Sequence, residues 1–198
     1  MQRFLGFLLI SFVFVASQAR ADLLIEPVVG YSMGINGEFA KGKVSGGGTT
    51  TKDSFSGGSG GSFGGRLGFQ KLGFQIGADY LHSSINPDDK ALKGNLSFDE
   101  WAGFVGFEFP ILLRVYGGYI FSAEGQGKYV SAGTTQKLTL KDGSGVKAGL
   151  GFTLLPFLDI NLEYRHGTFG EWKAGSTKVT GDVNYSVYMI GLSLPFTI

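Results

Sequence analysis

Cysteine is absent from this chain of 198 residues. The absence excludes disulfide bonds, thiolate metal sites, thiol nucleophiles and lipid attachment through cysteine. Charged residues are also scarce, at 17%, whereas the chain contains 34 Gly and 18 Phe. This composition is unusual for a cytosolic globular protein. The length is sufficient for one domain with a sizeable core.

Long hydrophobic runs are lacking as well, since no segment is apolar over the roughly 20 residues that a membrane-spanning helix requires. The apolar run from Phe4 to Ala16 is too short, but it follows Arg3 and precedes the small-x-small sequence Ala19-Arg20-Ala21. This order is typical of a secretory signal peptide that is cleaved off. We therefore expect residues 1–21 to be a signal peptide and residues 22–198 to form the mature domain.

The chain also lacks a marked excess of basic over acidic residues. Cleavage after Ala21 removes Arg3 and Arg20, which changes the formal net charge from +1 to −1. A chain with this balance has no basic footprint for nucleic acid. We therefore expect no nucleic acid partner.

Alternation of apolar and polar residues with a period of two recurs along the mature chain, and it predicts β-strands. In the stretch PFLDINLEYRHGTF, for example, Leu158, Ile160 and Leu162 alternate with charged or amide side chains. We expect eight strands, at roughly 23–35, 62–70, 72–83, 96–109, 112–122, 145–154, 158–167 and 183–196.

Each predicted strand has one face of large apolar residues and one face of glycine, small polar and charged residues. This pattern is typical of a transmembrane barrel, because lipid requires an apolar exterior while a narrow lumen tolerates paired polar groups. We assign Ile35 to the outer face and Ser122 to the inner face. Some large apolar residues also fall on the inner face, namely Leu81, Phe98, Phe104, Leu112 and Ile120.

Connections between the predicted strands alternate in length. Those near 71, 110–111 and 155–157 are short, whereas those at 36–61, 84–95, 123–144 and 168–182 are long. Outer-membrane barrels have short periplasmic turns and long extracellular loops. The lengths therefore favour an up-and-down barrel with both termini at the periplasmic end.

Aromatic residues on the apolar face are sorted by chain direction. Two aromatic girdles flanking an aliphatic band are typical of lipid interfaces. The phenylalanines gather toward the short turns. The predicted belt toward the long loops consists of Tyr31, Tyr80, Trp101, Tyr119, Tyr164 and Tyr188.

Charged residues in the middle of the strands share the glycine-rich face. An Arg or Lys at the midplane of the lipid face would cost roughly 2 to 4 kcal/mol, so this placement favours a charged lumen. We expect a structural salt-bridge network made of Glu26, Arg66, Asp79, Glu100, Arg114, Lys147, Glu163 and Arg165.

The predicted fold is therefore an all-β, eight-stranded antiparallel up-and-down transmembrane β-barrel. The signal sequence, GGY at 117–119, LEYR at 162–165 and YSVYMIGLSLPF at 185–196 resemble the small outer-membrane barrel superfamily typified by OmpA, OmpX and Ail. The resemblance covers the mature chain. It implies localisation in the outer membrane of a Gram-negative bacterium, and assembly by the barrel-assembly machinery.

An eight-stranded barrel is filled by its own interior side chains, so we expect no open pore. The predicted function is structural or surface-interactive, through long loops that recognise host, phage or matrix partners. We expect a monomer that contacts outer-membrane lipids and lipopolysaccharide and uses no cofactor or metal. A small-solute porin stays an alternative, as does a soluble, lipocalin-like secreted barrel.

A hydrolase is a further alternative, although we expect no enzymatic activity. His166, Thr168 and Glu171 cluster in the sequence and are similar to the His, hydroxyl and carboxylate of outer-membrane lipid A deacylases. In such a group, His deprotonates the hydroxyl and the carboxylate orients the imidazole. That family uses Ser where this chain has Thr168.

Overall fold

The computed structural model describes residues 21–39, 43–44, 47, 53–88, 94–131, 134–155 and 157–198. Three short strands, β2 (Lys43–Val44), β3 (Asp53–Ser56) and β11 (Phe196–Thr197), accompany eight long ones. The long strands are β1 (Asp22–Phe39), β4 (Ser59–Lys71), β5 (Phe74–Asn86), β6 (Leu96–Phe109), β7 (Leu113–Ser131), β8 (Thr134–Leu155), β9 (Leu158–Ala174) and β10 (Thr177–Ser193). None of the described residues belongs to a helix long and apolar enough to cross a membrane.

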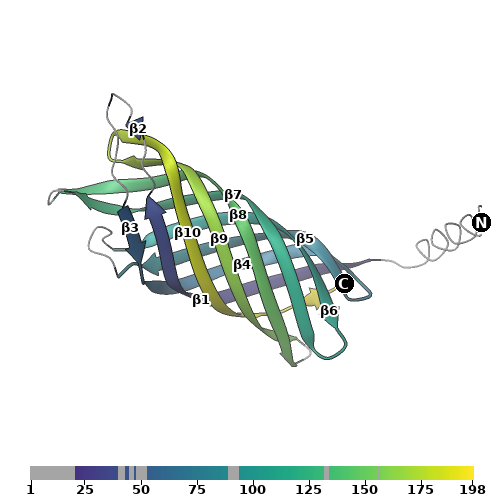
Figure 1. Ribbon diagram of the computed structural model, residues 1–198. Helices are drawn as coiled ribbons and strands as arrows, with labels where there is room; N and C mark the ends of the chain where they lie inside the picture. The colour runs from purple at the N-terminus through teal and green to yellow at the C-terminus, as the bar shows by residue number, and fades with distance from the viewer. Residues whose placement is uncertain are drawn as a thin grey trace, which may run out of the picture.

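The eight long strands form a closed antiparallel ring (Figure 1). Each pairs with the next in the chain, and β1 also pairs with β10, which closes the sheet. Following the paired residues once around the ring from Glu26 leads back to β1 at Gly37, eleven residues further along. Such a stagger accompanies strands that tilt against the barrel axis. The predicted eight-stranded up-and-down barrel is confirmed.

Both chain ends lie at the end of the barrel that carries the tight turns, here called the short-turn end. Leu23 exchanges two backbone hydrogen bonds with Ile198, of 2.8 and 3.0 Å. At this end, Leu72 and Leu112 were expected in strands, but they lie in turns, with φ of 51° and 64°. Leu112 is therefore exposed and does not face the lumen.

The opposite end, here called the long-loop end, contains more sheet than the sequence predicted. Within the expected loops at 123–144 and 168–182, residues 123–131, 134–144, 168–174 and 177–182 continue the strands that form the β7–β8 and β9–β10 hairpins. Strand β8 alone has 22 residues, whereas about 9–11 residues suffice to cross a bilayer. Figure 1 shows these hairpins projecting past the ring, near β2 and β3.

The inner and outer faces follow the predicted alternation over most of the barrel, including inward-facing Phe98, Phe104 and Ile120. The assignments of Ile35 and Ser122 were wrong, and each residue lies beside a register shift. Ile35 is fully buried, because the pairing with β10 shifts between Met33 and Asn36, where Gly34 adopts a φ of 63°. Ser122 is exposed, because the pairing of β7 with β8 shifts between Ile120 and Ala123. An extra residue in one strand reverses the faces beyond it.

Candidate functional site

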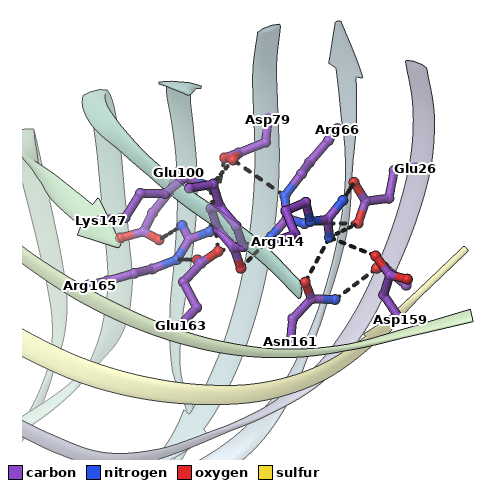
Figure 2. A network of polar contacts seen from close by, with 12 residues as sticks. Glu26, Arg66, Asp79, Glu100, Arg114, Lys147, Asp159, Asn161, Glu163 and Arg165 are labelled. Carbon is purple, nitrogen blue, oxygen red and sulfur yellow. Dashed lines mark hydrogen bonds and ion pairs between the residues drawn. The ribbon is translucent and has the colours of Figure 1, made fainter. Parts of the chain in front are cut away.

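Buried ion pairs fill the part of the lumen nearer the short-turn end (Figure 2). Glu163 is the central carboxylate on β9. Its Oε2 lies 3.0 Å from the guanidinium of Arg66 and 3.6 Å from Nζ of Lys147, and its Oε1 contacts Arg165. One side chain of β9 therefore pairs with cations from β4, from β8 and from β9 itself.

A second carboxylate, Glu26 on β1, joins two arginines. It lies 2.9 Å from Arg66 and 2.6 Å from Arg114. Arg114 also lies 3.3 Å from Asp159 and donates a hydrogen bond of 2.8 Å to Asn161. Arg66 thus connects the clusters around Glu26 and Glu163.

The remaining members of the group complete the network toward the long-loop end. Asp79 pairs with Lys147, and Arg165 pairs with Glu100. The structure thereby brings all eight charged residues of the expected network together inside the ring, from seven different strands.

Four network residues were not in the predicted set: Tyr116, Asp159, Asn161 and Tyr185. The alternation placed Asp159 and Asn161 on the inner face, and that signal would have been enough to include them. The two tyrosines were harder to recognise, since an inward aromatic resembles apolar filler. Tyr116 accepts a hydrogen bond of 2.9 Å from Arg66, whose guanidinium lies 4.4 Å from the ring centroid.

The network holds its charges tightly paired and almost without exposure to solvent. Removing charges from water costs several kcal/mol per ion, which is recovered only with close pairing and further hydrogen bonds. The described residues contain no group of three or more His, Asp or Glu side chains arranged to hold a metal ion. The geometry therefore suits a fixed electrostatic crosslink between strands.

Above the network, toward the long-loop end, the interior is apolar. We call this cluster the plug; its members come from seven of the eight long strands, all except β4, and from β3. The rings of Phe98, Phe169 and Tyr185 stack with centroids 5.2 to 6.0 Å apart. The Tyr185 hydroxyl donates a hydrogen bond to Glu100, so the plug rests directly on the charged network.

A second part of the plug lies farther toward the long-loop end and joins the β9–β10 hairpin to β1 and β3. The ring of Phe39 packs against Phe55 at 5.6 Å and against Trp172 at 5.3 Å. Leu138 and Leu140 of β8 are also buried in the plug. The inner side of the projecting sheet is thus part of the hydrophobic core.

The outer wall is a continuous surface of exposed large apolar residues. All six aromatics of the predicted belt point outward. The ring of Tyr80 packs against Trp101 and the ring of Tyr164 against Tyr188, each pair with centroids 5.0 Å apart. Tyr80 donates a hydrogen bond of 2.6 Å to Asp99, which lies 2.9 Å from His82. The Tyr80 phenol therefore has an apolar body and a hydrogen-bonded polar tip, as an interfacial aromatic requires.

The residues of the hydrolase alternative point outward but pair elsewhere. His166 Nδ1 lies 2.9 Å from the Ser186 hydroxyl, and Thr168 donates to Asn184 at 2.7 Å. Glu171 pairs with Lys178 and, at 3.4 Å, with Lys173. Among the contacts of the described residues, none joins these three into a relay from carboxylate to imidazole to hydroxyl.

Lysines gather on the outer face of the projecting sheet. Lys128 of β7 is paired in register with Lys137 of β8, and Lys173 of β9 with Lys178 of β10. Lys141 of β8 stands opposite Glu171 of β9. The hydrogen bond from Lys178 and the charge of Lys173 hold the pKa of the Glu171 carboxyl below its usual range. We call these five lysines the lysine patch.

Known proteins resemble this chain in fold and not in sequence. No family model and no curated protein sequence matches it. The solved structure of Ail, the attachment invasion locus protein of Yersinia pestis, matches with a TM-score of 0.52 and 16% identity, over 87% of this chain and 98% of that one. This chain has the fold of a small outer-membrane β-barrel.

Two further solved structures also match. Neisserial surface protein A gives a TM-score of 0.49 and 16% identity, over 88% of this chain and 97% of that chain. A second structure of the Yersinia pestis protein, in complex with the heparin analogue sucrose octasulfate, gives 0.52 and 15% identity over 88% and 99%. The outer-membrane barrel fold of this chain and its apolar outer wall together place it in a bacterial outer membrane.

Proposed function

We propose that the protein is a closed, non-conducting outer-membrane barrel whose work is done by the surface of its long-loop end. The sealed interior is the observation that carries this proposal. Salt bridges fill one half of the lumen and the plug fills the other. A solute would have to displace both, which argues against the alternative of a small-solute porin.

The experiment for the closed lumen is conductance across a planar lipid bilayer. The purified, folded protein is expected to give no stable current steps above background. Steps of porin size would support the alternative of a small-solute channel and refute the closed barrel.

The lysine patch supports a more specific function, the binding of an anionic polymer. Five lysines lie on one sheet face, and Glu171 pairs with two of them, Lys173 and Lys178. Like charges directly opposite one another destabilise a sheet, and an anionic partner would relieve the repulsion of Lys128 and Lys137. The complex of the similarly folded Yersinia pestis protein with a heparin analogue makes a sulfated glycan the first partner to test.

Replacing Lys128, Lys137 and Lys173 by alanine tests this binding. Retention on immobilised heparin should fall for the triple variant, and the retention of the native protein should fall with added salt because exposed charges are screened. Lys71→Ala, at the short-turn end, is the matched control. Equal retention of the native and triple-variant proteins would refute the role of the lysine patch while leaving the closed lumen untouched.

The other expected relationships stay predictions. They are the cleaved signal peptide, of which only Ala21 lies within the described residues, the monomeric state, assembly by the barrel-assembly machinery, binding of lipopolysaccharide and the lack of enzymatic activity. A soluble barrel is disfavoured by the apolar outer wall, because monomeric soluble proteins rarely expose apolar patches beyond a few hundred Å².

A further inference from the structure

An apolar groove of about 550 Å³ runs along the outer wall between β7 and β10. Its sides are the outward-facing side chains of Val115, Leu150, Leu162, Tyr164 and Ile190, all at least partly exposed. The groove lies just below the aromatic belt, of which Tyr164 is a member. It is therefore a hollow in the surface that faces the membrane.

Small residues create this hollow. Ala148 is the outward residue of β8 at the level of Tyr164, with which it is paired, and its partner on the other side is Gly117 of β7. One step closer to the short turns, the outward positions are the larger Leu162, Leu150 and Val115. Ala148 and Gly117 therefore present only a methyl group and a hydrogen atom, whereas the next row of outward residues toward the short turns has branched side chains.

A polar ledge borders the groove on the side of the long-loop end. The Tyr164 hydroxyl donates to the Ser186 hydroxyl at 3.2 Å, and His166 Nδ1 lies 2.9 Å from the same oxygen. Imidazole, serine and phenol groups can all donate hydrogen bonds to phosphate oxygens. Since Tyr164 belongs to both features, the ledge and the groove are continuous.

We propose that this groove holds one acyl chain of a phosphorylated membrane lipid, with the lipid phosphate on the ledge of Tyr164, His166 and Ser186. The groove is continuous with the apolar wall that the barrel presents to the bilayer, so lipid chains are the material that reaches it. Its polar border matches the order of a lipid, with the charged headgroup outermost and the chain toward the midplane. The site is independent of the lysine patch.

Native mass spectrometry of the protein released from phosphatidylglycerol nanodiscs tests the groove. The wild-type protein should retain one phosphatidylglycerol per chain. Ala148→Leu, which fills the hollow, should lose it. Val105→Leu also enlarges an apolar side chain, by one methylene group, at an exposed position of the outer wall that does not line the groove, and it should retain the lipid as the wild type does.

A second measurement addresses the ledge, with diacylglycerol of the same chains as the probe lacking phosphate. The wild type should prefer phosphatidylglycerol, and His166→Ala should lose that preference while still retaining diacylglycerol. Equal lipid retention by Ala148→Leu and wild type would overturn the proposal. So would loss in Val105→Leu, or a dimer in place of the lipid-bound monomer, which would identify a second copy as the occupant.

Discussion

Glu163 shows how a single side chain can hold several strands together. Its carboxylate contacts Arg66, Lys147 and Arg165, and the side chain has no exposed surface. A carboxylate in this position lowers the cost of burying all three cations. The same position filled by a neutral group would leave them facing one another.

Glu163→Gln is therefore expected to destabilise the barrel strongly. Removing one partner of a buried ion pair typically costs about 3–5 kcal/mol, because the remaining charge stays buried without compensation. The measurement is urea unfolding in detergent, followed by the heat-modifiable migration of the folded barrel. Glu124→Gln, at an exposed position of β7, is the control and should unfold like the wild type. Identical midpoints for all three proteins would contradict the structural role of the network.

Glu171 should make the β9–β10 hairpin sensitive to acid. Its carboxyl pKa is lowered by the hydrogen bond from Lys178 and by Lys173. A lowered pKa in the folded state means that the carboxylate contributes stability above its unfolded pKa, near 4.3, and that this contribution is lost as the pH falls through the folded pKa. An NMR titration in micelles should give a higher Glu171 pKa in Lys178→Gln than in the wild type. An unchanged value would show that the pair does not form.

Residue positions were predictable from the sequence wherever the alternation ran unbroken. Glu163 and Arg165 follow Asp159 and Asn161 at intervals of two, so their common direction could be inferred without coordinates. Ile35 and Ser122 could not be placed, because each lies beside a register shift that depends on how two strands pair. The contacts of Tyr116 and Tyr185 with charged groups depend on the width of the closed ring, which no single strand reveals.

The strand continuations at the long-loop end are the main difference between expectation and structure at the scale of elements. Residues 123–144 are rich in Gly, Thr and Lys, which suggested a loop. They form sheet because Leu138 and Leu140 point inward into the plug. Burial of a few apolar side chains that alternate with lysines and threonines is enough to extend a hairpin when a hydrophobic neighbour is present.

Trp172 is expected to stabilise the long-loop end of the barrel against local unfolding. It packs on Phe39 at 5.3 Å, so Trp172→Ala removes this ring contact between the β9–β10 hairpin and the end of β1. Truncation of a buried aromatic costs about 3–5 kcal/mol. The loss should be local, with faster hydrogen exchange in residues 36–39 and 53–56 and unchanged exchange near Glu163. Lys173→Ala, on the outer face, should leave both regions unchanged, and uniform protection in Trp172→Ala would contradict the local role of the plug.

At the scale of the whole molecule, the lumen is closed twice along its length. The network and the plug occupy successive sections of one channel and meet at the hydrogen bond from Tyr185 to Glu100. Barriers in series are independent obstacles, so opening either one alone leaves the other in place. The current through a variant that opens both sections is therefore expected to exceed the sum of the currents through the two variants that open one section each.

Two double variants and their combination test this arrangement in planar bilayers. Phe98→Ala with Phe169→Ala opens the plug, and Arg66→Ala with Arg165→Ala opens the network; each pair alone is expected to give no stable current. The four substitutions together should conduct, with preference for cations, because Glu26, Asp79, Glu100 and Glu163 would then line the lumen with fewer positive partners. Heat-modifiable migration must show that each variant is folded. Current through either double variant would mean that the section left intact does not seal the barrel, and anion preference in the combined variant would contradict the assigned charges of the lumen.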